Sequence, residues 1–173
     1  MLRTSGLLLL SLLFAASAAV SAPVWTEYHP QEVAFSVQLP GKWKVTSETE
    51  KTDGGDVKVV SADVDGDTAS YSAVYAVYPA DKMRGRPVAT TLDGVRDGAV
   101  ANIKGKLRKE DKIELGGLPA RQIVIDAPND IVVVNRFLLI GNTLVQVLVS
   151  GPKGIENQPD SARFLSSLKP VGS

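Results

Sequence analysis

The side chains able to carry out chemistry are few in this chain. Its 173 residues include no cysteine and a single histidine, His29, which lies between Tyr28 and Pro30. A histidine that acts as a base needs a partner held within hydrogen-bond distance, and no motif around His29 supplies one. The sequence also lacks the glycine-flanked serine of α/β-hydrolases, a glycine-rich phosphate loop and the paired histidines of zinc proteases. We therefore expect a protein that is not an enzyme and that holds no cofactor.

Two serine–lysine spacings remain as candidates for nucleophilic catalysis. Ser150 with Lys153, and Ser166 with Lys169, each fit the pattern Ser-x-x-Lys. The pattern arises easily by chance, and Lys169 follows a predicted helix end, where a cation interacts favourably with the helix dipole. A hydrolase would also need Ser150 and Lys153 to converge beside an oxyanion hole, so a Ser-Lys hydrolase is the weaker alternative function.

Three alternating carboxylates are the best candidate for a metal site. Asp63, Asp65 and Asp67 are spaced like the first ligands of a calcium loop. That loop also needs glycine at its sixth position and glutamate at its twelfth, where this chain has Thr68 and Val74. We therefore predict a charged hairpin turn, with a weak calcium contact as the alternative, and assign no metal site.

A group of three cations is the candidate contact for another protein. Lys82, Arg84 and Arg86 fall in a predicted loop, directly after a strand that carries Tyr71 and Tyr75. Arginine and aromatic side chains are enriched at the centres of protein interfaces. The alternative is core packing by the two tyrosines and an ordinary solvated loop after them.

The first 22 residues have the three regions of a secretory signal peptide. Arg3 gives a positive start, residues 7–14 form an unbroken apolar run, and residues 15–22 are small. The alternative, a retained membrane anchor, needs about 20 apolar residues, and this run is much shorter. No cysteine follows it to accept a lipid, so we expect a periplasmic or secreted protein without stable membrane insertion. Cleavage fits after three positions: Ala18, Ser21 and Ala22.

Residues 23–173 are expected to fold as one domain. A chain of about 150 residues buries roughly 68–70% of its unfolded surface, so it needs no disulfides to stabilise its core. Lysine plus arginine and aspartate plus glutamate each number 19, and the two signs are interspersed. Such a surface has no field of one sign to attract nucleic acid or an anionic membrane.

Hydrophobic periodicity predicts strands, a helix, more strands and a closing helix. The alternating apolar residues of strands are bounded by turn residues, among them Gly116-Gly117 and Gly141-Asn142. The first four strands are expected to form an antiparallel meander. Gly94 and Gly98 weaken the first helix, so packing must stabilise it. The predicted strands cover residues 33–39, 43–49, 57–64, 69–78, 106–115, 120–126, 131–140 and 143–150, and the helices cover residues 91–104 and 159–168.

The strand at residues 131–140 determines the expected architecture. It is apolar at both alternating sets of positions, so neither of its faces can lie against water. The two predicted helices can cover one face each, which predicts an α+β fold: an antiparallel β-sheet with helices on both faces. The alternative places both helices on one face, with loops or a second copy burying the other.

Several segments resemble one known family. They are residues 35–43 (FSVQLPGKW), the turn at residues 117–121 (GLPAR), the hairpin through Arg136-Phe137 and Gly141-Asn142, and residues 162–168 (ARFLSSL). Together they are similar to the PsbP-like superfamily, which includes the photosystem II extrinsic protein PsbP and bacterial periplasmic DcrB-like proteins. The resemblance implies an α/β/α sandwich and a non-catalytic role, and it transfers no binding residue to this chain.

These observations lead to an expected function and an alternative. We expect an exported, non-catalytic accessory protein that contacts another envelope or secreted protein at the outer side of a membrane, through Lys82, Arg84 and Arg86. The alternative is a small-ligand or lipid carrier, which requires a cavity between the sheet and the helix at residues 91–104. The sequence leaves the oligomeric state, the partner and any ligand open.

Overall fold

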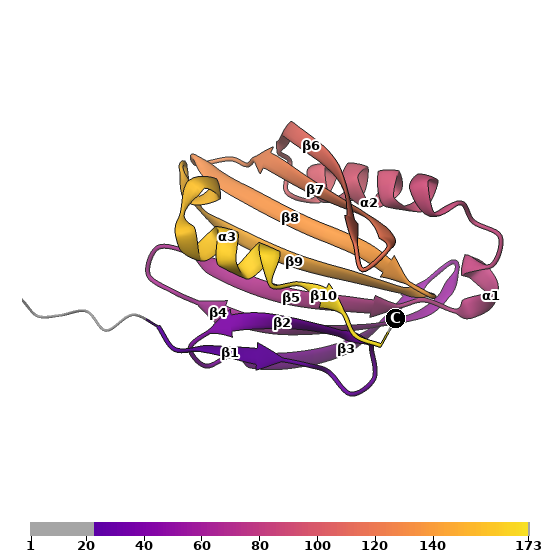
Figure 1. Ribbon diagram of the computed structural model, residues 1–173. Coiled ribbons are helices and arrows are strands. Elements are labelled where there is room, and N and C mark those ends of the chain that lie inside the picture. The colour runs from indigo at the N-terminus through magenta and orange to yellow at the C-terminus, as the bar shows by residue number, and fades with distance from the viewer. Residues whose placement is uncertain (1–22, 173) are drawn as a thin grey trace, which may run out of the picture.

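A seven-stranded antiparallel sheet forms the centre of the computed structural model, which describes residues 23–172 (Figure 1). The predicted signal peptide at residues 1–22 lies outside the described residues. In sheet order the strands are β3 (Lys44–Thr52), β4 (Gly55–Asp65), β5 (Ser70–Val77), β9 (Thr143–Pro152), β8 (Ile131–Ile140), β7 (Leu118–Asp126) and β6 (Lys106–Leu115). Each of these strands overlaps one expected from the sequence, and β6 lies at an edge, where its charged residues deter pairing with another chain.

Tight turns set the register of this sheet. Gly116 and Gly117, between β6 and β7, have φ of 56° and 80°, which glycine adopts without a steric penalty. Gly141, between β8 and β9, has φ of 61°. The next residue, Asn142, donates from Nδ2 to the carbonyl oxygen of Tyr78 and so attaches this turn to the end of β5. Both turns confirm the sequence prediction.

A second sheet, which the sequence analysis did not predict, has three strands. Its order is β1 (Trp25–Tyr28), β2 (Phe35–Pro40) and β10 (Lys169–Pro170). The expected hairpin between β2 and β3 is therefore wrong, because Gly41, at φ 72°, turns the chain from one sheet into the other. The alternation in β2 misled the prediction: Ser36 is only 2% exposed, and β2 is buried on both faces.

The two longer helices belong to different hydrophobic clusters. α3 (Pro159–Ser166) packs on the face that also carries the small sheet, and α2 (Val88–Asn102) packs on β7 and β8. The alternative that placed both helices on one face is wrong. A short helix, α1 (Ala80–Met83), follows β5 in place of the expected loop, and a 3₁₀ turn (Ile155–Asn157) precedes α3.

Neither of the two longer helices has a capping side chain. α3 follows Gln158 and has Pro159 as its first residue, a position that proline favours. α2 begins earlier than expected, after Pro87, and no side chain caps it.

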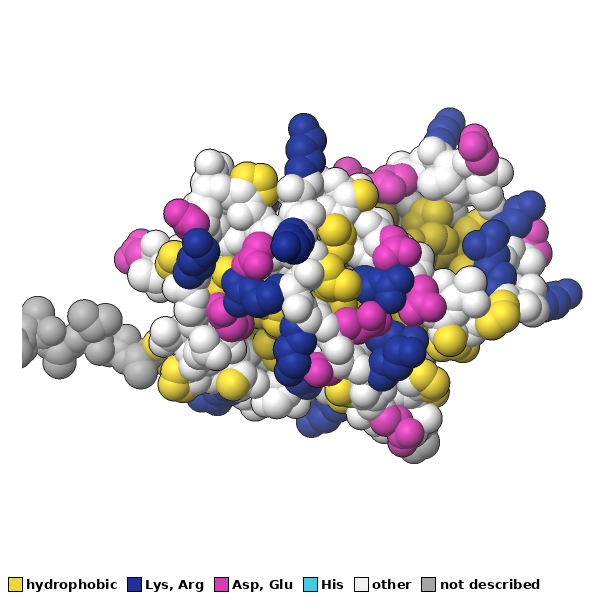
Figure 2. All heavy atoms as spheres, turned by 90° about the horizontal axis from the view of Figure 1, so that it is seen from above, with side chains coloured by type: hydrophobic (Ala, Val, Ile, Leu, Met, Phe, Trp, Pro, Cys, Tyr) yellow, Lys and Arg dark blue, Asp and Glu magenta, His cyan; other side chains and the backbone are white. Residues whose placement is uncertain are grey.

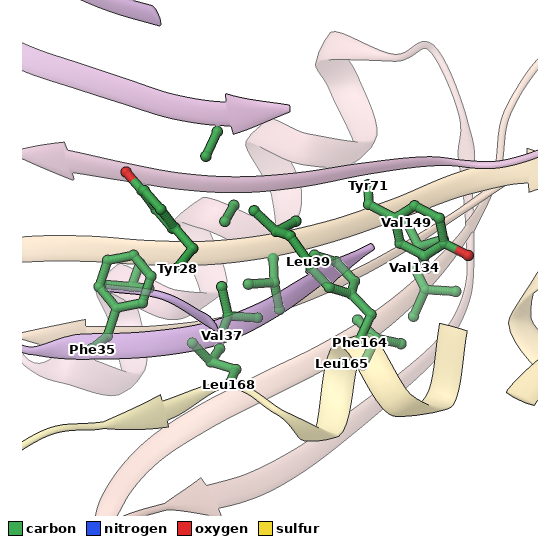
Figure 3. Packing of buried hydrophobic residues seen from close by; sticks show 14 of the residues in the cluster. Tyr28, Phe35, Val37, Leu39, Tyr71, Val134, Val149, Phe164, Leu165 and Leu168 are labelled. Carbon is green, nitrogen blue, oxygen red and sulfur yellow. The ribbon is translucent and has the colours of Figure 1, made fainter. Parts of the chain in front are cut away.

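The larger hydrophobic cluster fills the space between the two sheets and α3 (Figure 3). Phe35 of β2 meets Tyr75 edge to face, with the ring centroids 6.0 Å apart, and Tyr71 meets Phe164 of α3 at 5.2 Å. Edge-to-face pairs are worth about 0.5–1.5 kcal/mol beyond the area they bury. Tyr71 and Tyr75 are therefore core residues, as the alternative interpretation of this aromatic strand expected.

An ion cluster around the buried Arg121 connects α2 to the edge of the large sheet. The Nε atom of Arg121 lies 3.1 Å from Oε1 of Glu110, and the same carboxylate accepts a hydrogen bond of 2.9 Å from Arg96 of α2. Asp93 adds a contact of 3.5 Å to Arg121, whose residue is only 5% exposed. The Arg121–Glu110 pair is close but not aligned as a hydrogen bond, so its attraction is mainly electrostatic.

We expect Glu110→Gln to lower the free energy of unfolding by about 2–4 kcal/mol, because it leaves the buried Arg121 charge with only Asp93 for compensation. Urea denaturation of the mature protein measures the change. Glu114→Gln is the control, because Glu114 is exposed on the same strand, and it should change stability by less than about 0.5 kcal/mol. Equal effects of the two substitutions would contradict the role of the ion cluster.

Candidate functional site

An open cleft of about 820 Å³ lies between α2 and one end of the large sheet. α2 covers β7 and β8, and the cleft opens beside it, over the ends of β4 and β9. Figure 2 shows a hollow with hydrophobic side chains at its base, and basic side chains gather at the same end of the molecule, where Figure 1 places α1. Its volume is within the range of sites that bind small molecules, about 300–1,000 Å³.

The base of the cleft is apolar because alternate residues of the strands face α2. Val57 of β4, Leu139 of β8 and Leu144 of β9 line it, and each is at most 8% exposed. Gln146 is the polar residue among them, and its side-chain oxygen accepts a hydrogen bond of 3.0 Å from Asn135. The base therefore offers mainly carbon atoms to a ligand.

Two glycines widen the cleft on the side formed by α2, because they place no side chain in it. Gly94 and Gly98 both line the cleft, and a Cβ atom added to either would meet no atom within 4 Å. Neither has a positive φ, so the backbone conformation does not require glycine. Glycine inside a helix costs about 0.5–1 kcal/mol relative to alanine. These two residues leave space open without contributing to packing.

The end wall of the cleft is cationic. Lys82 of α1 and Arg86 line it, together with Tyr78, Met83 and Pro87, and the lining contains no carboxylate. Lys82 has only its neighbour Asp81 nearby, at 3.9 Å. Burial, followed by the charge of nearby Glu50, raises the pKa of Tyr78, so the phenol stays protonated at neutral pH. Hydroxyl and amide groups complete the polar lining: Thr52, Thr90, Thr91 and Asn102.

The three cations of the predicted protein contact do not all lie at the cleft. Lys82 and Arg86 reach the cleft, whereas Arg84 does not line it. All three are exposed. The sequence placed these cations in one loop but did not associate them with the predicted helix at residues 91–104, which forms the adjacent wall.

The serine–lysine pairs are not arranged for catalysis. Lys153 forms an ion pair with Asp130 at 2.6 Å, and this hydrogen bond raises the pKa of the Lys153 ammonium, whereas a lysine base needs a lowered pKa. Lys169 is 3.4 Å from Glu27, and Ser166 donates to a backbone carbonyl of its own helix. Lys153, Ser166 and Lys169 therefore contact groups other than those the motif would pair with them.

The remaining sequence candidates have structural partners. Nδ1 of His29 is 2.7 Å from the backbone oxygen of Phe35, to which it donates. Asp63 lies in β4 and accepts hydrogen bonds from Ser61 and Ser72, at 2.5 and 2.6 Å. Across residues 23–172, no three histidine, cysteine, aspartate or glutamate side chains are grouped to hold a metal ion.

Sequence reasoning did not connect Gly94 and Gly98 with a cleft. Both lie inside a helix that needs packing for its stability, and this weakness was visible in the sequence. The reason for the glycines was not visible in the sequence. A glycine in a helix can either allow another element to pack closely or leave an open space, and only the positions of the surrounding atoms distinguish these two cases.

We expect Gly98→Ala to raise the free energy of unfolding by about 0.5–1 kcal/mol, because the added methyl group meets no atom and alanine favours the helix. Thermal unfolding provides the measurement. Gly105→Ala is the matched contrast and should destabilise the protein, because its Cβ would lie 2.5 Å from Ile125 and 2.8 Å from the carbonyl oxygen of Asp126. Loss of stability in Gly98→Ala would show that this glycine is needed for packing.

Comparisons with known proteins identify the fold. The solution structure of cyanobacterial PsbP (CyanoP) from Synechocystis sp. PCC 6803 matches 92% of this chain and 99% of its own, with a TM-score of 0.59 and 10% sequence identity. A protein of unknown function from Pseudomonas aeruginosa, PA94, described as a putative regulator, matches 80% of this chain and 90% of its own, with a TM-score of 0.43 and 14% identity. No family model and no curated protein matches the sequence. The chain has a PsbP-like α+β fold built mostly from antiparallel strands, which confirms the resemblance at the level of the fold. Within residues 23–172, no helix is long and apolar enough to cross a membrane.

Proposed function

We propose that this protein with a PsbP-like fold is an exported, non-catalytic binding protein that holds a small ligand in the cleft between α2 and the large sheet. The observation that carries the proposal is the cleft itself, which has an apolar base and a few polar groups around one end. Small-molecule sites have this composition, in which apolar surface provides affinity and a few polar groups set orientation. Export is inferred from the signal-peptide pattern of residues 1–22.

The residue types around the cleft favour binding over catalysis. Its lining contains no histidine, cysteine, aspartate or glutamate, the side chains that most often act as base or nucleophile in enzymes. The hydroxyl groups present are those of Thr52, Tyr78, Thr90 and Thr91, and Thr91 donates to the carbonyl oxygen of Pro87. The arrangement suits a site that positions a ligand without transforming it.

The proposal is tested by titrating the mature protein with N-phenyl-1-naphthylamine, a neutral apolar dye that fluoresces when it leaves water. We expect saturable binding to the wild-type protein and weaker binding to Gly98→Leu, whose side chain would occupy the cleft. Losing roughly 60 Å² of apolar contact costs about 1.5 kcal/mol, which corresponds to about tenfold weaker binding.

Ala101→Leu is the control for this experiment. It adds the same side chain to the same helix at an exposed position that does not line the cleft, so dye affinity should stay within about twofold of the wild type. Dye binding that is absent, or that both leucine variants alter equally, would rule out the cleft as the site.

Binding to another exported protein is the second candidate function, and the observation in its favour is a set of three exposed cations. Arg84 and Arg86 have no side-chain hydrogen bond or ion pair with any described residue, and Lys82 has only the distant contact to Asp81. Arginine side chains free of internal partners can bind the carboxylates of a partner. This function would use the rim of the cleft instead of its base.

We expect the variant with Lys82, Arg84 and Arg86 all changed to alanine to keep its stability within about 1 kcal/mol of the wild type, because all three side chains are exposed. Affinity capture from an envelope or secreted extract, followed by mass spectrometry, compares the two proteins. A partner retained by the wild type and lost by the variant would support a protein contact here. A partner that both retain equally would exclude this loop.

A further inference from the structure

Most arginines in the described part of the chain form hydrogen bonds to other residues, and those that do not lie near the cationic end of the cleft. Five arginines donate to carboxylates, amide oxygens or backbone carbonyls, and they are spread over α2, α3 and the large sheet. Within residues 23–172, the two without such a bond are Arg84 and Arg86. Of these two, only Arg86 lines the cleft. Its guanidinium is available to an external acceptor. The five bonded arginines are Arg96, Arg108, Arg121, Arg136 and Arg163.

The start of α2 adds positive potential at the same end. α2 begins at Val88, directly after Arg86 and Pro87, with no side-chain cap and no acidic residue in its first turn. The backbone N–H groups of a first helical turn lack partners within the helix and carry partial positive charge. Thr90, in this turn, lines the cleft. The helix end therefore reinforces the field of Lys82 and Arg86.

Negative groups do not cancel this field inside the cleft. Its lining has two cations and no anion. The carboxylates nearby include those of Asp81, which is 3.9 Å from Lys82, Glu50, which acts on Tyr78, and Asp53, which lies between Thr52 and Gly54 in the chain. None of these three residues lines the cleft. Charge complementarity therefore favours an anionic group at this end.

The rest of the cleft favours a chain of carbon atoms. Along α2 its lining extends from Thr90 to Asn102, which at about 1.5 Å per residue corresponds to roughly 18 Å. The side opposite α2 is formed by buried Val57, Leu139 and Leu144, with Gln146 as its polar member. An open cleft with a mainly apolar base and positive charge at one end matches a ligand with the same division.

Resting on the proposed function, we infer that the ligand is a single-chain amphiphile with a terminal carboxylate. Its chain lies along Gly94 and Gly98, where the missing side chains leave room, and its carboxylate lies between Lys82 and Arg86. A guanidinium and an ammonium together can serve the two oxygens of one carboxylate, and charge-assisted hydrogen bonds of this kind are the stronger ones in proteins. The apolar chain supplies affinity, and the two cations select the head group.

Displacement of N-phenyl-1-naphthylamine from the mature protein by four competitors tests the inference. Decanoate has both the chain and the carboxylate, decanol and decyltrimethylammonium have the chain with a neutral or positive head, and acetate has the carboxylate alone. We expect decanoate to displace the dye at concentrations about tenfold lower than decanol or decyltrimethylammonium, with acetate ineffective, since two exposed charge contacts contribute about 1–2 kcal/mol together. Raising the salt concentration should reduce the advantage of decanoate.

The variants separate the head-group contact from the cleft. Changing Lys82 and Arg86 together to alanine should weaken decanoate binding about tenfold more than it weakens decanol binding. Arg84→Ala is the matched control, because it removes an equally unpaired cation of the same loop that does not line the cleft, and it should change neither affinity.

The outcomes distinguish this inference from the proposed function on which it rests. If the dye binds and Gly98→Leu weakens it, but decanoate shows no advantage over decanol, the carboxylate assignment is overturned while a binding cleft remains. The assignment is also overturned if Arg84→Ala weakens decanoate as much as the double variant does, because the effect is then general surface charge. If the dye does not bind, or Gly98→Leu leaves its affinity unchanged, the proposed function and the inference fail together.

Discussion

The central strands of the large sheet are apolar on both faces, and the fold is stable only if both faces are covered. β8 and β9 place buried side chains on both sides, so exposing either face to water would lose the burial that stabilises the fold. The small sheet and α3 cover one face and together form the larger cluster. α2 covers the other over β7 and β8 only. The cleft is the part of the second face that α2 leaves uncovered.

The shape of the cleft depends on which side of α2 is held by contacts with the sheet. Two internal glycines lower its helix propensity, so its position depends on Leu92, which is fully buried, and on the ion cluster with Glu110 and Arg121. These contacts lie on the side of the helix that faces β6 and β7. Gly94 and Gly98 lie on the side that faces the cleft. One helix therefore provides an anchored side and an open side.

Most polar side chains that could take part in catalysis or metal binding form hydrogen bonds or ion pairs within the protein. Asp63 is bonded to two serines, Lys153 to Asp130, and His29 to a backbone oxygen. Such bonds satisfy side chains and fix strands and turns, and they leave these groups little capacity for a substrate. The cations in and just after α1 are the exception. The Arg86 side chain has no partner among the described residues and Lys82 has only a distant contact to Asp81, and both lie next to an apolar surface. The proposed function and the ligand assignment rest on this feature.

Residues close together in the chain specify the local elements of this protein. Period-two alternation located the strands of the large sheet, glycine turns fixed their hairpins, and the change of period located α2 and α3, because these signals depend on residues close in the chain. Segments spread along the sequence also indicated the PsbP-like fold. The tertiary structure alone decided that β2 leaves its neighbour β3 for a second sheet, since strand pairing depends on which distant surface buries β2. It also decided that Lys82 and Arg86 meet the open side of α2, because the empty space beside Gly94 and Gly98 is a property of the atoms around them.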